Sequence, residues 1–267
     1  MAYYIEYAAL CDKGFVREKN QDNIWCNGHF FNSENDGLIE PLTGTIDIST
    51  MPAFALFDGM GGEQQGEMAA FLAASNFDTI QQKSEKTETK TFLLDACREL
   101  NKAICLYQTE NHIRHMGTTA AILMCGMDAI YICNLGDSRI YQFSRKKLTQ
   151  ITQDHVELSV TQGKAPLTQN LGISEEEFII EPYIAKGEYK RGDRFLICSD
   201  GLTDMVTDEQ IAGVFKKKMS LQQTAQTLMD MALSNGGIDN ITIIICSILK
   251  KKKISTTDFR VSLSNTI

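Results

Sequence analysis

The hydrophobic pattern of this chain alternates between short strand-like runs and longer helical segments. Apolar stretches rich in β-branched and aromatic residues are typical of strands, and they occupy residues 3–10, 24–31, 53–57, 118–125, 129–135, 139–143, 177–185, 194–198 and 241–248. Apolar residues at helical spacing predict helices over 65–82, 93–107, 208–217 and 221–234. The polar segments 32–50 and 152–173 are predicted to be loops, the second with one short helix near His155.

The order of these elements favours an α+β fold. Strands come first, then a helix pair, a strand meander, a second helix pair and a closing strand, which fits two packed antiparallel sheets, each covered on its outside by helices. With no repeat and no clear linker, residues 1–249 are predicted to form one domain. Residues 250–267 are basic and then Ser/Thr-rich, and we expect this tail to be disordered.

Composition narrows the possible functions. The 267 residues carry a formal net charge of -8, which argues against a nucleic-acid partner. Eight scattered cysteines without a C-x-x-C pair are typical of free thiols in a reducing compartment, so we expect a cytoplasmic protein, and a monomer. The N-terminus lacks the pattern of a signal peptide, and no apolar run approaches the ~20 residues of a membrane span. Lys250–Lys253 could attract anionic lipid, although a solvated chain end is the simpler interpretation.

The stretch AFALFDGMGGEQQGEMAA, residues 53–70, organises the candidate chemistry. It predicts a buried strand that ends in Asp58, a tight glycine turn over residues 59–62, and a helix. A carboxylate at the end of a buried strand has a rigid support, and glycines let the neighbouring backbone approach an ion closely.

Three more aspartates share this context, a strand end beside glycine: Asp137, Asp200 and Asp239. Each alone could simply belong to a turn. Together, at one rim of packed sheets, four anions would repel one another unless cations lay between them. Oxygen ligands favour Mg²⁺ or Mn²⁺, and two such ions ~3.5–4 Å apart can activate a water for in-line displacement at phosphorus. Arg17, in a polar turn, is the candidate for binding phosphate oxygens.

Six short motifs carry a family resemblance that spans residues 5–249. They are Arg17-Asn20-Asp22, FDGMGG at 57–62, MGTT at 116–119, NLGDSR at 134–139, SDGLTD at 199–204 and DNIT at 239–242. In this order they resemble the metal-dependent protein Ser/Thr phosphatases, the type 2C family, in its bacterial form.

The resemblance implies a four-layer α/β/β/α sandwich with a centre of two Mn²⁺ or Mg²⁺ ions. At the matching positions, Asp58 would bridge both ions and the carbonyl of Gly59 would bind one of them. Asp200 and Asp239 would hold the other ion.

The remaining roles also come from the resemblance. Asp22 would act through metal-bound water, and Asp137 and Asp204 would join Asp200 in a possible third metal site. Arg17 would bind the substrate phosphate, and residues 155–175 would form the family's flap.

The implied activity is hydrolysis of phosphoserine and phosphothreonine in proteins by direct attack of a water held between the two ions. Its partners would be phosphorylated proteins in signalling, opposite a Ser/Thr kinase. Two positions depart from the family pattern: Gln21 replaces a glutamate, which weakens one water-mediated metal contact, and Met60 stands where eukaryotic members carry a histidine proposed as a general acid.

Two other functions compete with this one. A cysteine-based phosphatase needs a C-x5-R loop, and the chain has formal matches from Cys11 to Arg17 and from Cys133 to Arg139. Both loops contain an aspartate that would repel phosphate. The other alternative is a catalytically silent module that binds phosphoproteins or a regulatory partner on the same fold; the complete set of predicted metal ligands argues against it.

Overall fold

The computed structural model describes residues 3–60, 65–83, 88–157, 165–174 and 176–250, and they build two antiparallel sheets. The first sheet has the strand order β3 (Leu42–Asp47), β1 (Tyr3–Asp12), β12 (Ile241–Lys250), β11 (Arg194–Cys198), β8 (Arg139–Ser144) and β9 (Lys147–Gln150). The second has the order β10 (Tyr183–Gly187), β7 (Ile130–Leu135), β6 (Ala120–Cys125), β4 (Ala53–Met60) and β2 (Asp22–Cys26), and β5 (Gly117–Thr118) pairs with the end of β4.

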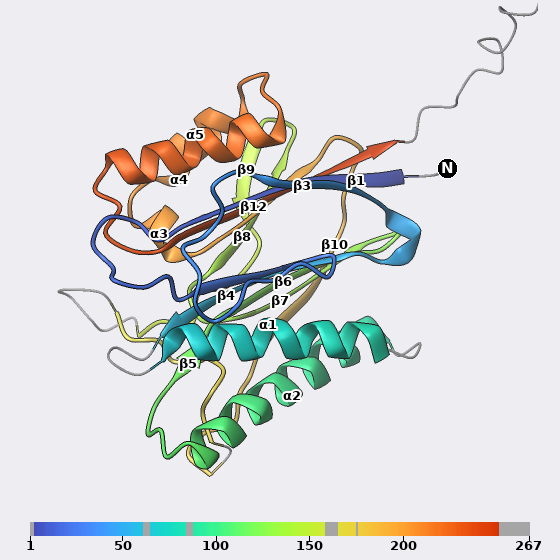
Figure 1. Cartoon of the computed structure of the whole chain (residues 1–267). Coiled ribbons are helices and arrows are strands. Elements are labelled where there is room, and N and C mark those ends of the chain that lie inside the picture. The colour runs from blue at the N-terminus through green and yellow to red at the C-terminus, as the bar shows by residue number, and fades with distance from the viewer. Residues whose placement is uncertain (1–2, 61–64, 84–87, 158–164, 175, 251–267) are drawn as a thin grey trace, which may run out of the picture.

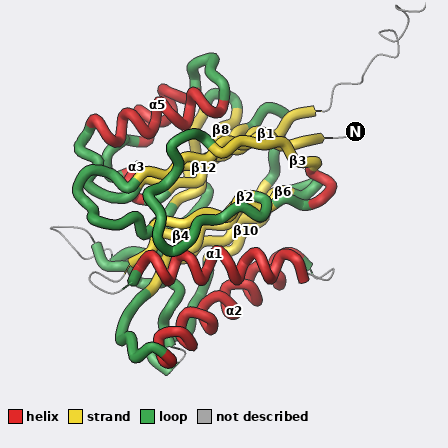
Figure 2. Tube along the Cα trace, viewed as in Figure 1, coloured by secondary structure: helices red, strands yellow, loops and turns green. Residues whose placement is uncertain are grey.

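Helices cover the outer face of each sheet, so the predicted four-layer α/β/β/α sandwich is confirmed (Figure 1). The outer face of the second sheet is covered by α1 (Gly66–Lys83) and α2 (Thr89–Glu110). The first sheet is covered by α3 (Asp200–Thr203), α4 (Asp208–Phe215) and α5 (Leu221–Ser234). A short 3-10 turn, Ile48–Thr50, leads from β3 toward β4. Figure 2 shows the two strand layers between the two helix layers.

The layered packing explains why β12 is apolar along almost its whole length. Alternate side chains of a strand point to opposite faces. Ile244 and Cys246 pack in the core between the sheets, whereas Ile243 and Ile245 pack in the core under α4 and α5. Since both faces of this strand are buried, its central part does not alternate between apolar and polar residues.

The structure differs from the sequence prediction at β2 and at β3. β2 stops at Cys26 rather than at residue 31, because Asn27 and Gly28 adopt positive φ angles of 52° and 87° and form a tight turn. The segment 32–50 is not all loop, since Leu42–Asp47 forms β3. This edge strand has Gly44 opposite Tyr7, whose ring lies where a Cβ on Gly44 would sit.

Other boundaries also shift. The strand predicted over 177–185 is found at Tyr183–Gly187, and β9 and the one-turn helix α3 were not predicted. No helix occurs in the described residues around His155, where Val156 instead bridges to Leu167. β4 continues through Asp58 to Met60, so this aspartate lies within the strand and not after it.

Three sequence expectations fall partly or wholly outside the described residues. They concern the second half of the glycine turn, at residues 61–62, part of the predicted flap, and the tail from residue 251 onward. Among the described helices, none combines the length and the apolar composition that crossing a bilayer requires.

Candidate metal centre

Asp22 and Asp58 are directly opposite each other on the neighbouring strands β2 and β4. Cross-strand partners have side chains on the same face ~5 Å apart, and like charges in such a pair destabilise the sheet. The backbone beside them is tightly packed: the Gly59 N–H donates to the Gln21 carbonyl at 3.0 Å, and a Cβ on Gly59 would lie 2.2 Å from the Gly66 carbonyl oxygen. Only glycine fits here, and two carboxylates are held close together.

The Asp22 carboxylate also joins the two sheets. Its Oδ2 accepts hydrogen bonds from Thr242 Oγ1 at 2.6 Å and from Ser199 Oγ at 2.9 Å, and the Thr242 N–H donates to Ser199 Oγ at 2.9 Å. Ser199 directly precedes Asp200 at the end of β11, and Thr242 follows Asp239 by three residues at the start of β12. These bonds therefore bring the segments that carry Asp200 and Asp239 to the edge occupied by Asp22.

The environment of Asp22 fits a divalent cation nearby. Burial, first, and then the neighbouring charge of Asp239 raise the pKa of Asp22 to about 6, against the lowering effect of hydrogen bonds with Thr242, Ser199 and Asp58. The second carboxylate oxygen, Oδ1, is buried and makes no hydrogen bond to the described residues. A buried polar atom without a partner is costly. A hard cation, bound directly or through water, would satisfy this oxygen, and carboxylates are the donors that Mg²⁺ and Mn²⁺ prefer.

Arg17 lies over the same edge. Its Nε donates to Asp239 Oδ1 at 2.9 Å and its Nη2 donates to Asp239 Oδ2 at 2.7 Å, which is a bidentate pair. The hydrogen bonds to Asp239 raise the pKa of Arg17, and the charge of Asp58 raises it as well. The Arg17 side chain is half exposed, whereas that of Asp239 is only 21% exposed. The predicted phosphate-binding residue is therefore adjacent to predicted metal ligands and reachable from solvent.

Asn240 fastens the Arg17 loop to the Asp239 loop. Its Oδ1 accepts from the Gln21 N–H at 2.8 Å, and its Nδ2 donates to the carbonyls of Lys13 and Lys19 at 2.8 and 3.0 Å. Across the loop, a Cβ on Gly201 would lie 2.0 Å from the Asn240 carbonyl oxygen. Loops more than 200 residues apart in sequence are thus held in one place.

Sequence reasoning assigned no role to Ser199, Thr242 or Asn240. The available signal was their position: each is a polar residue at the junction of a very apolar strand and one of the conspicuous aspartates. Such residues most often satisfy local backbone groups, and only the packing of one sheet on the other shows that Ser199 and Thr242 bind Asp22.

The other predicted acids lie at the same rim. Asp137 is in the turn between β7 and β8, and Arg139, two residues later, pairs in register with Cys198, two residues before Asp200. The Asp204 N–H donates to the Asp200 carbonyl at 2.7 Å across the single turn of α3. The three acids of the predicted third metal site therefore lie in the same region of the rim, and their role as ligands stays a prediction.

The loop after β9 is hydrogen-bonded to the turn between β7 and β8, which contains Asp137. His155 and Gly136 exchange two hydrogen bonds, from the His155 N–H to the Gly136 carbonyl at 3.0 Å and from the Gly136 N–H to His155 Nδ1 at 3.2 Å. Burial lowers the pKa of His155, in keeping with a neutral imidazole that accepts through Nδ1. Arg139 also binds Asp154, with Nη2 2.7 Å from Oδ2. These contacts give His155 a role in stabilising the loop. Of the predicted flap, residues 158–164 and 175 lie outside the described residues.

Within the described ranges, no three His, Cys, Asp or Glu side chains already converge with the spacing of metal ligands. One reason is visible: both Asp239 oxygens are directed to Arg17. Cation binding by Asp239 would require this carboxylate to share or release one of those hydrogen bonds. The assignment of individual ligands accordingly remains a prediction.

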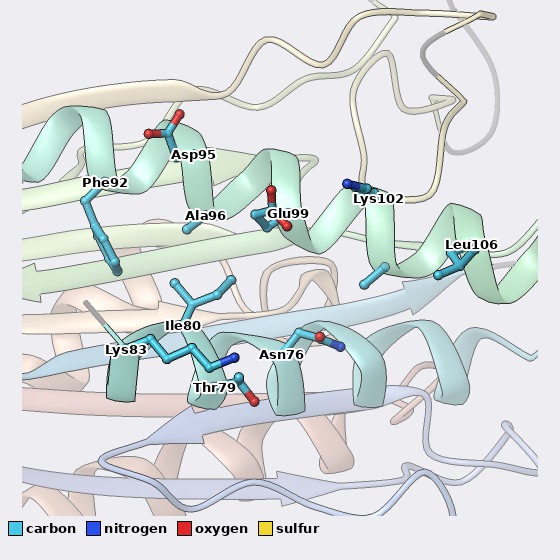
Figure 3. A pocket seen from close by; sticks show the side chains of 11 residues that line it. Asn76, Thr79, Ile80, Lys83, Phe92, Asp95, Ala96, Glu99, Lys102 and Leu106 are labelled. Carbon is cyan, nitrogen blue, oxygen red and sulfur yellow. The ribbon is translucent and has the colours of Figure 1, made fainter. Parts of the chain in front are cut away.

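Two hollows lie on different sides of the molecule. One of about 450 Å³ is lined by Arg17, Gln21 and Glu67 beside the carboxylates. Another of about 560 Å³ lies between the outer helices α1 and α2, where Figure 3 shows Ile80 and Phe92 among its lining side chains. The second hollow contains none of the predicted site residues and is not a candidate for the phosphate chemistry.

Thiol-based phosphate chemistry does not fit this structure. Cys11 and Cys133 lie inside strands β1 and β7, both fully buried, and burial raises the pKa of Cys11 to about 12. The pKa of Cys133 is also raised well above its usual value, first by the contact of its Sγ with Cys97 Sγ at 3.4 Å and then by burial. A nucleophilic cysteine needs an accessible thiolate of low pKa, so both C-x5-R matches are coincidental.

A family comparison decides the general class. The model of the protein phosphatase 2C family matches residues 45–235, well over half of the chain. The chain belongs to the protein phosphatase 2C family. This confirms the resemblance drawn from the six motifs.

Two relatives illustrate the similarity, and both come from bacteria. The serine/threonine phosphatase stp of Listeria monocytogenes is 28% identical over 250 residues, which cover 88% of this chain and 92% of that protein. The serine/threonine protein phosphatase PstP of Mycobacterium tuberculosis is 28% identical over 256 residues, covering 92% of this chain but only 45% of the longer PstP.

Solved structures of such phosphatases share the fold over nearly the whole chain. The Mycobacterium tuberculosis phosphatase PstP/Ppp superimposes with a TM-score of 0.76 at 27% identity, covering 93% of this chain and all of that one. The catalytic domain of PstP in complex with two manganese ions gives a TM-score of 0.75 with the same identity and coverage. A Streptococcus agalactiae serine/threonine phosphatase gives 0.75 at 25% identity, covering 92% and 100%.

Proposed function

We propose that this chain is a Mn²⁺- or Mg²⁺-dependent phosphatase that hydrolyses phosphoserine and phosphothreonine in proteins. The observation that carries the proposal is the Asp22 carboxylate, which is held between the two sheets with one buried oxygen unpaired beside Asp58 and Asp239. Family membership and the manganese ions of the PstP catalytic domain support it.

Four groups would hold two cations: the carboxylates of Asp58, Asp200 and Asp239 and the carbonyl of Gly59. Asp22 would act through bound water, and Asp137 and Asp204 would add to Asp200 at a third site. When bound, such cations supply charge neutralisation for phosphate and lower the pKa of a water that can attack phosphorus. Every predicted ligand is an oxygen donor, in keeping with hard divalent ions.

The side chains of the protein would bind the substrate phosphate and hold Asp22 in its ionised form. Arg17 would bind two phosphate oxygens with the planar fork that it now offers to Asp239. Thr242 and Ser199 favour the ionised form of Asp22, because both hydroxyls donate to the same carboxylate oxygen. Met60 carries no proton to donate, so a leaving alkoxide must take its proton from water or another group.

Gln21 has a defined partner. Its Nε2 donates to Glu67 Oε2 at 3.1 Å, and Glu67 also forms an ion pair with Lys19. The residue that departs from the family pattern is thus engaged at the base of α1. This agrees with the weaker water-mediated metal contact that we infer for position 21.

The biological setting that we propose is reversal of a Ser/Thr kinase in bacterial signalling, by a cytoplasmic monomer. No observation specifically favours a silent binding module, but turnover decides between the two. We expect metal-stripped protein to release phosphate from a phosphothreonine peptide only after Mn²⁺ or Mg²⁺ is restored, with reversal by chelator. Absence of turnover by clean, metal-loaded protein would refute the enzyme proposal.

A further inference from the structure

Exposed apolar side chains gather next to Arg17. Among the described residues, eight large hydrophobic side chains are exposed, and three of them, Phe15, Val16 and Ile238, belong to the two loops that carry Arg17 and Asp239. Their exposed fractions are 72%, 64% and 49%. Isolated exposed apolar residues are ordinary, whereas a cluster beside a polar site suggests a binding surface. We call Phe15, Val16 and Ile238 the apolar patch.

The apolar patch is held in place by the backbone. The Phe15 N–H donates to the Gly237 carbonyl at 2.8 Å, and the edge of the Phe15 ring lies 3.1 Å from the position that a Cβ on Gly237 would occupy. A Cβ on Gly14 would lie 2.4 Å from the Asp239 carbonyl oxygen, so the two loops are in close contact. Contacts of this kind reduce the entropy that a binding surface loses when it is occupied.

The patch borders a hollow that also contains the predicted phosphate-binding side chain. Val16 and Ile238 line the cavity of about 450 Å³ together with Arg17, Lys19 and Glu67. Val16 is the neighbour of Arg17 in sequence, and Ile238 is the neighbour of Asp239. A phosphorylated side chain bound at Arg17 would therefore place its own peptide backbone next to this wall.

We propose that the apolar patch binds an apolar side chain of the substrate, within two residues of the phosphorylated serine or threonine. The inference rests on the proposed phosphatase function and adds a preference among its substrates. An extended peptide rises ~3.3 Å per residue, so one or two residues on either side of the phosphate fall within reach of the hollow. Within the hollow, Val16 would cover one side of the bound side chain and Ile238 the other.

The test compares paired phosphothreonine peptides that carry leucine or serine at each of the four flanking positions. We expect the Mn²⁺-loaded wild type to favour leucine at one or more positions by about 10-fold in kcat/KM, the scale at which hydrophobic pockets discriminate. The difference should appear mainly in KM. Val16→Ser and Ile238→Ser should each reduce the leucine preference toward a ratio of one. Both positions are exposed, so these variants are expected to fold.

Met127→Ser is the matched control. Met127 is 64% exposed and lies in the turn between β6 and β7, at the other end of the sheet from the Asp22–Asp58 pair. This variant should keep the full leucine preference. Equal kcat/KM for leucine and serine peptides in the wild type, or a preference that survives both patch variants, would overturn the inference.

Two further readouts separate this inference from the proposed function. Hydrolysis of p-nitrophenyl phosphate with Mn²⁺ reports catalysis without any peptide, so its absence would count against the phosphatase activity itself. Peptide affinity, measured by competition against a fluorescein-labelled phosphothreonine peptide, reports the leucine preference without turnover. Equal affinities for the leucine and serine peptides would refute the proposed binding role of the apolar patch, whether or not the protein is an active phosphatase.

Discussion

Replacement of Asp22 by asparagine should stabilise the protein in chelator while it weakens metal-dependent activity. The carboxylate is buried, its pKa is raised to about 6, and one of its oxygens has no hydrogen bond to the described residues. An unfolded aspartate titrates near ~3.9, and each unit of difference corresponds to ~1.4 kcal/mol. The ionised side chain therefore reduces the stability of the folded protein by about 3 kcal/mol at neutral pH.

The pH dependence follows from the sign of this shift. Since the folded-state pKa of Asp22 lies above the unfolded value, the folded protein binds the proton more tightly. The resulting stabilisation is complete below the unfolded pKa of ~3.9 and is lost as pH rises through about 6. The asparagine side chain of the variant has no proton to lose. The stability advantage of Asp22→Asn should grow from about 1 kcal/mol at pH 4.5 to about 3 kcal/mol at pH 7.5.

Urea unfolding in chelator measures this difference. The chain has a single tryptophan, Trp25, which is buried in β2 with its ring centroid 5.2 Å from that of Phe77, so its fluorescence reports unfolding near the site. With a urea dependence of about 3 kcal/mol per M, the midpoint at pH 7.5 should rise by about 1 M. Asp128→Asn, at an exposed turn far from the rim, should leave it unchanged. A midpoint for Asp22→Asn equal to or below that of the wild type at pH 7.5 would refute the reasoning.

Three other predictions address the proposed roles. Arg17→Ala should raise KM for a phosphopeptide about 10-fold or more with a smaller effect on kcat, because a bidentate phosphate contact is lost; an unchanged KM would count against its role. Asp58→Asn and Asp239→Asn should each lower kcat/KM more than about 100-fold while circular dichroism spectra stay native, and calorimetry should show weaker Mn²⁺ binding. Thiol alkylation of native protein should modify Cys105, the one cysteine that is not buried, without loss of activity; inactivation with labelling of a buried thiol, followed by mass spectrometry, would contradict this.

Much of the fold could be predicted because strands and helices here have strong local patterns. The helix Leu221–Ser234 and the strand Arg194–Cys198 match their predicted ranges, since their apolar spacing leaves little choice of element. The edge strand Leu42–Asp47 has no such pattern. It forms because β1 lies beside it, with Gly44 against Tyr7. This pairing joins segments that are distant in sequence, so the residues of β3 alone do not predict it. The turn at Asn27–Gly28 did have a local signal, the Asn-Gly pair.

The candidate site likewise contains residues that local motifs predict and residues that only the three-dimensional structure reveals. Aspartates beside glycines at strand ends could be found from sequence because each motif is short and contiguous. The groups that bind those carboxylates could not, since they depend on how one sheet lies on the other. Thr242 reaches Asp22 across 220 residues of sequence, and Arg17 reaches Asp239 across 222.

The carboxylates that these long-range contacts hold together reduce the stability of the protein but suit the binding of cations. Burial of Asp22 opposite Asp58 costs stability, so selection for stability alone would favour a neutral side chain at either position. Arg17 offsets part of the negative charge through Asp239, but it leaves Asp22 Oδ1 unsatisfied. A group of costly carboxylates, fixed by hydroxyls and by Asn240 at the meeting point of four strands, is what a site for divalent cations requires. The hydrogen bonds from Thr242 and Ser199 would join the two sheets equally well to a neutral oxygen, so the destabilising burial of a charge at Asp22 supports the proposal that this rim binds divalent cations.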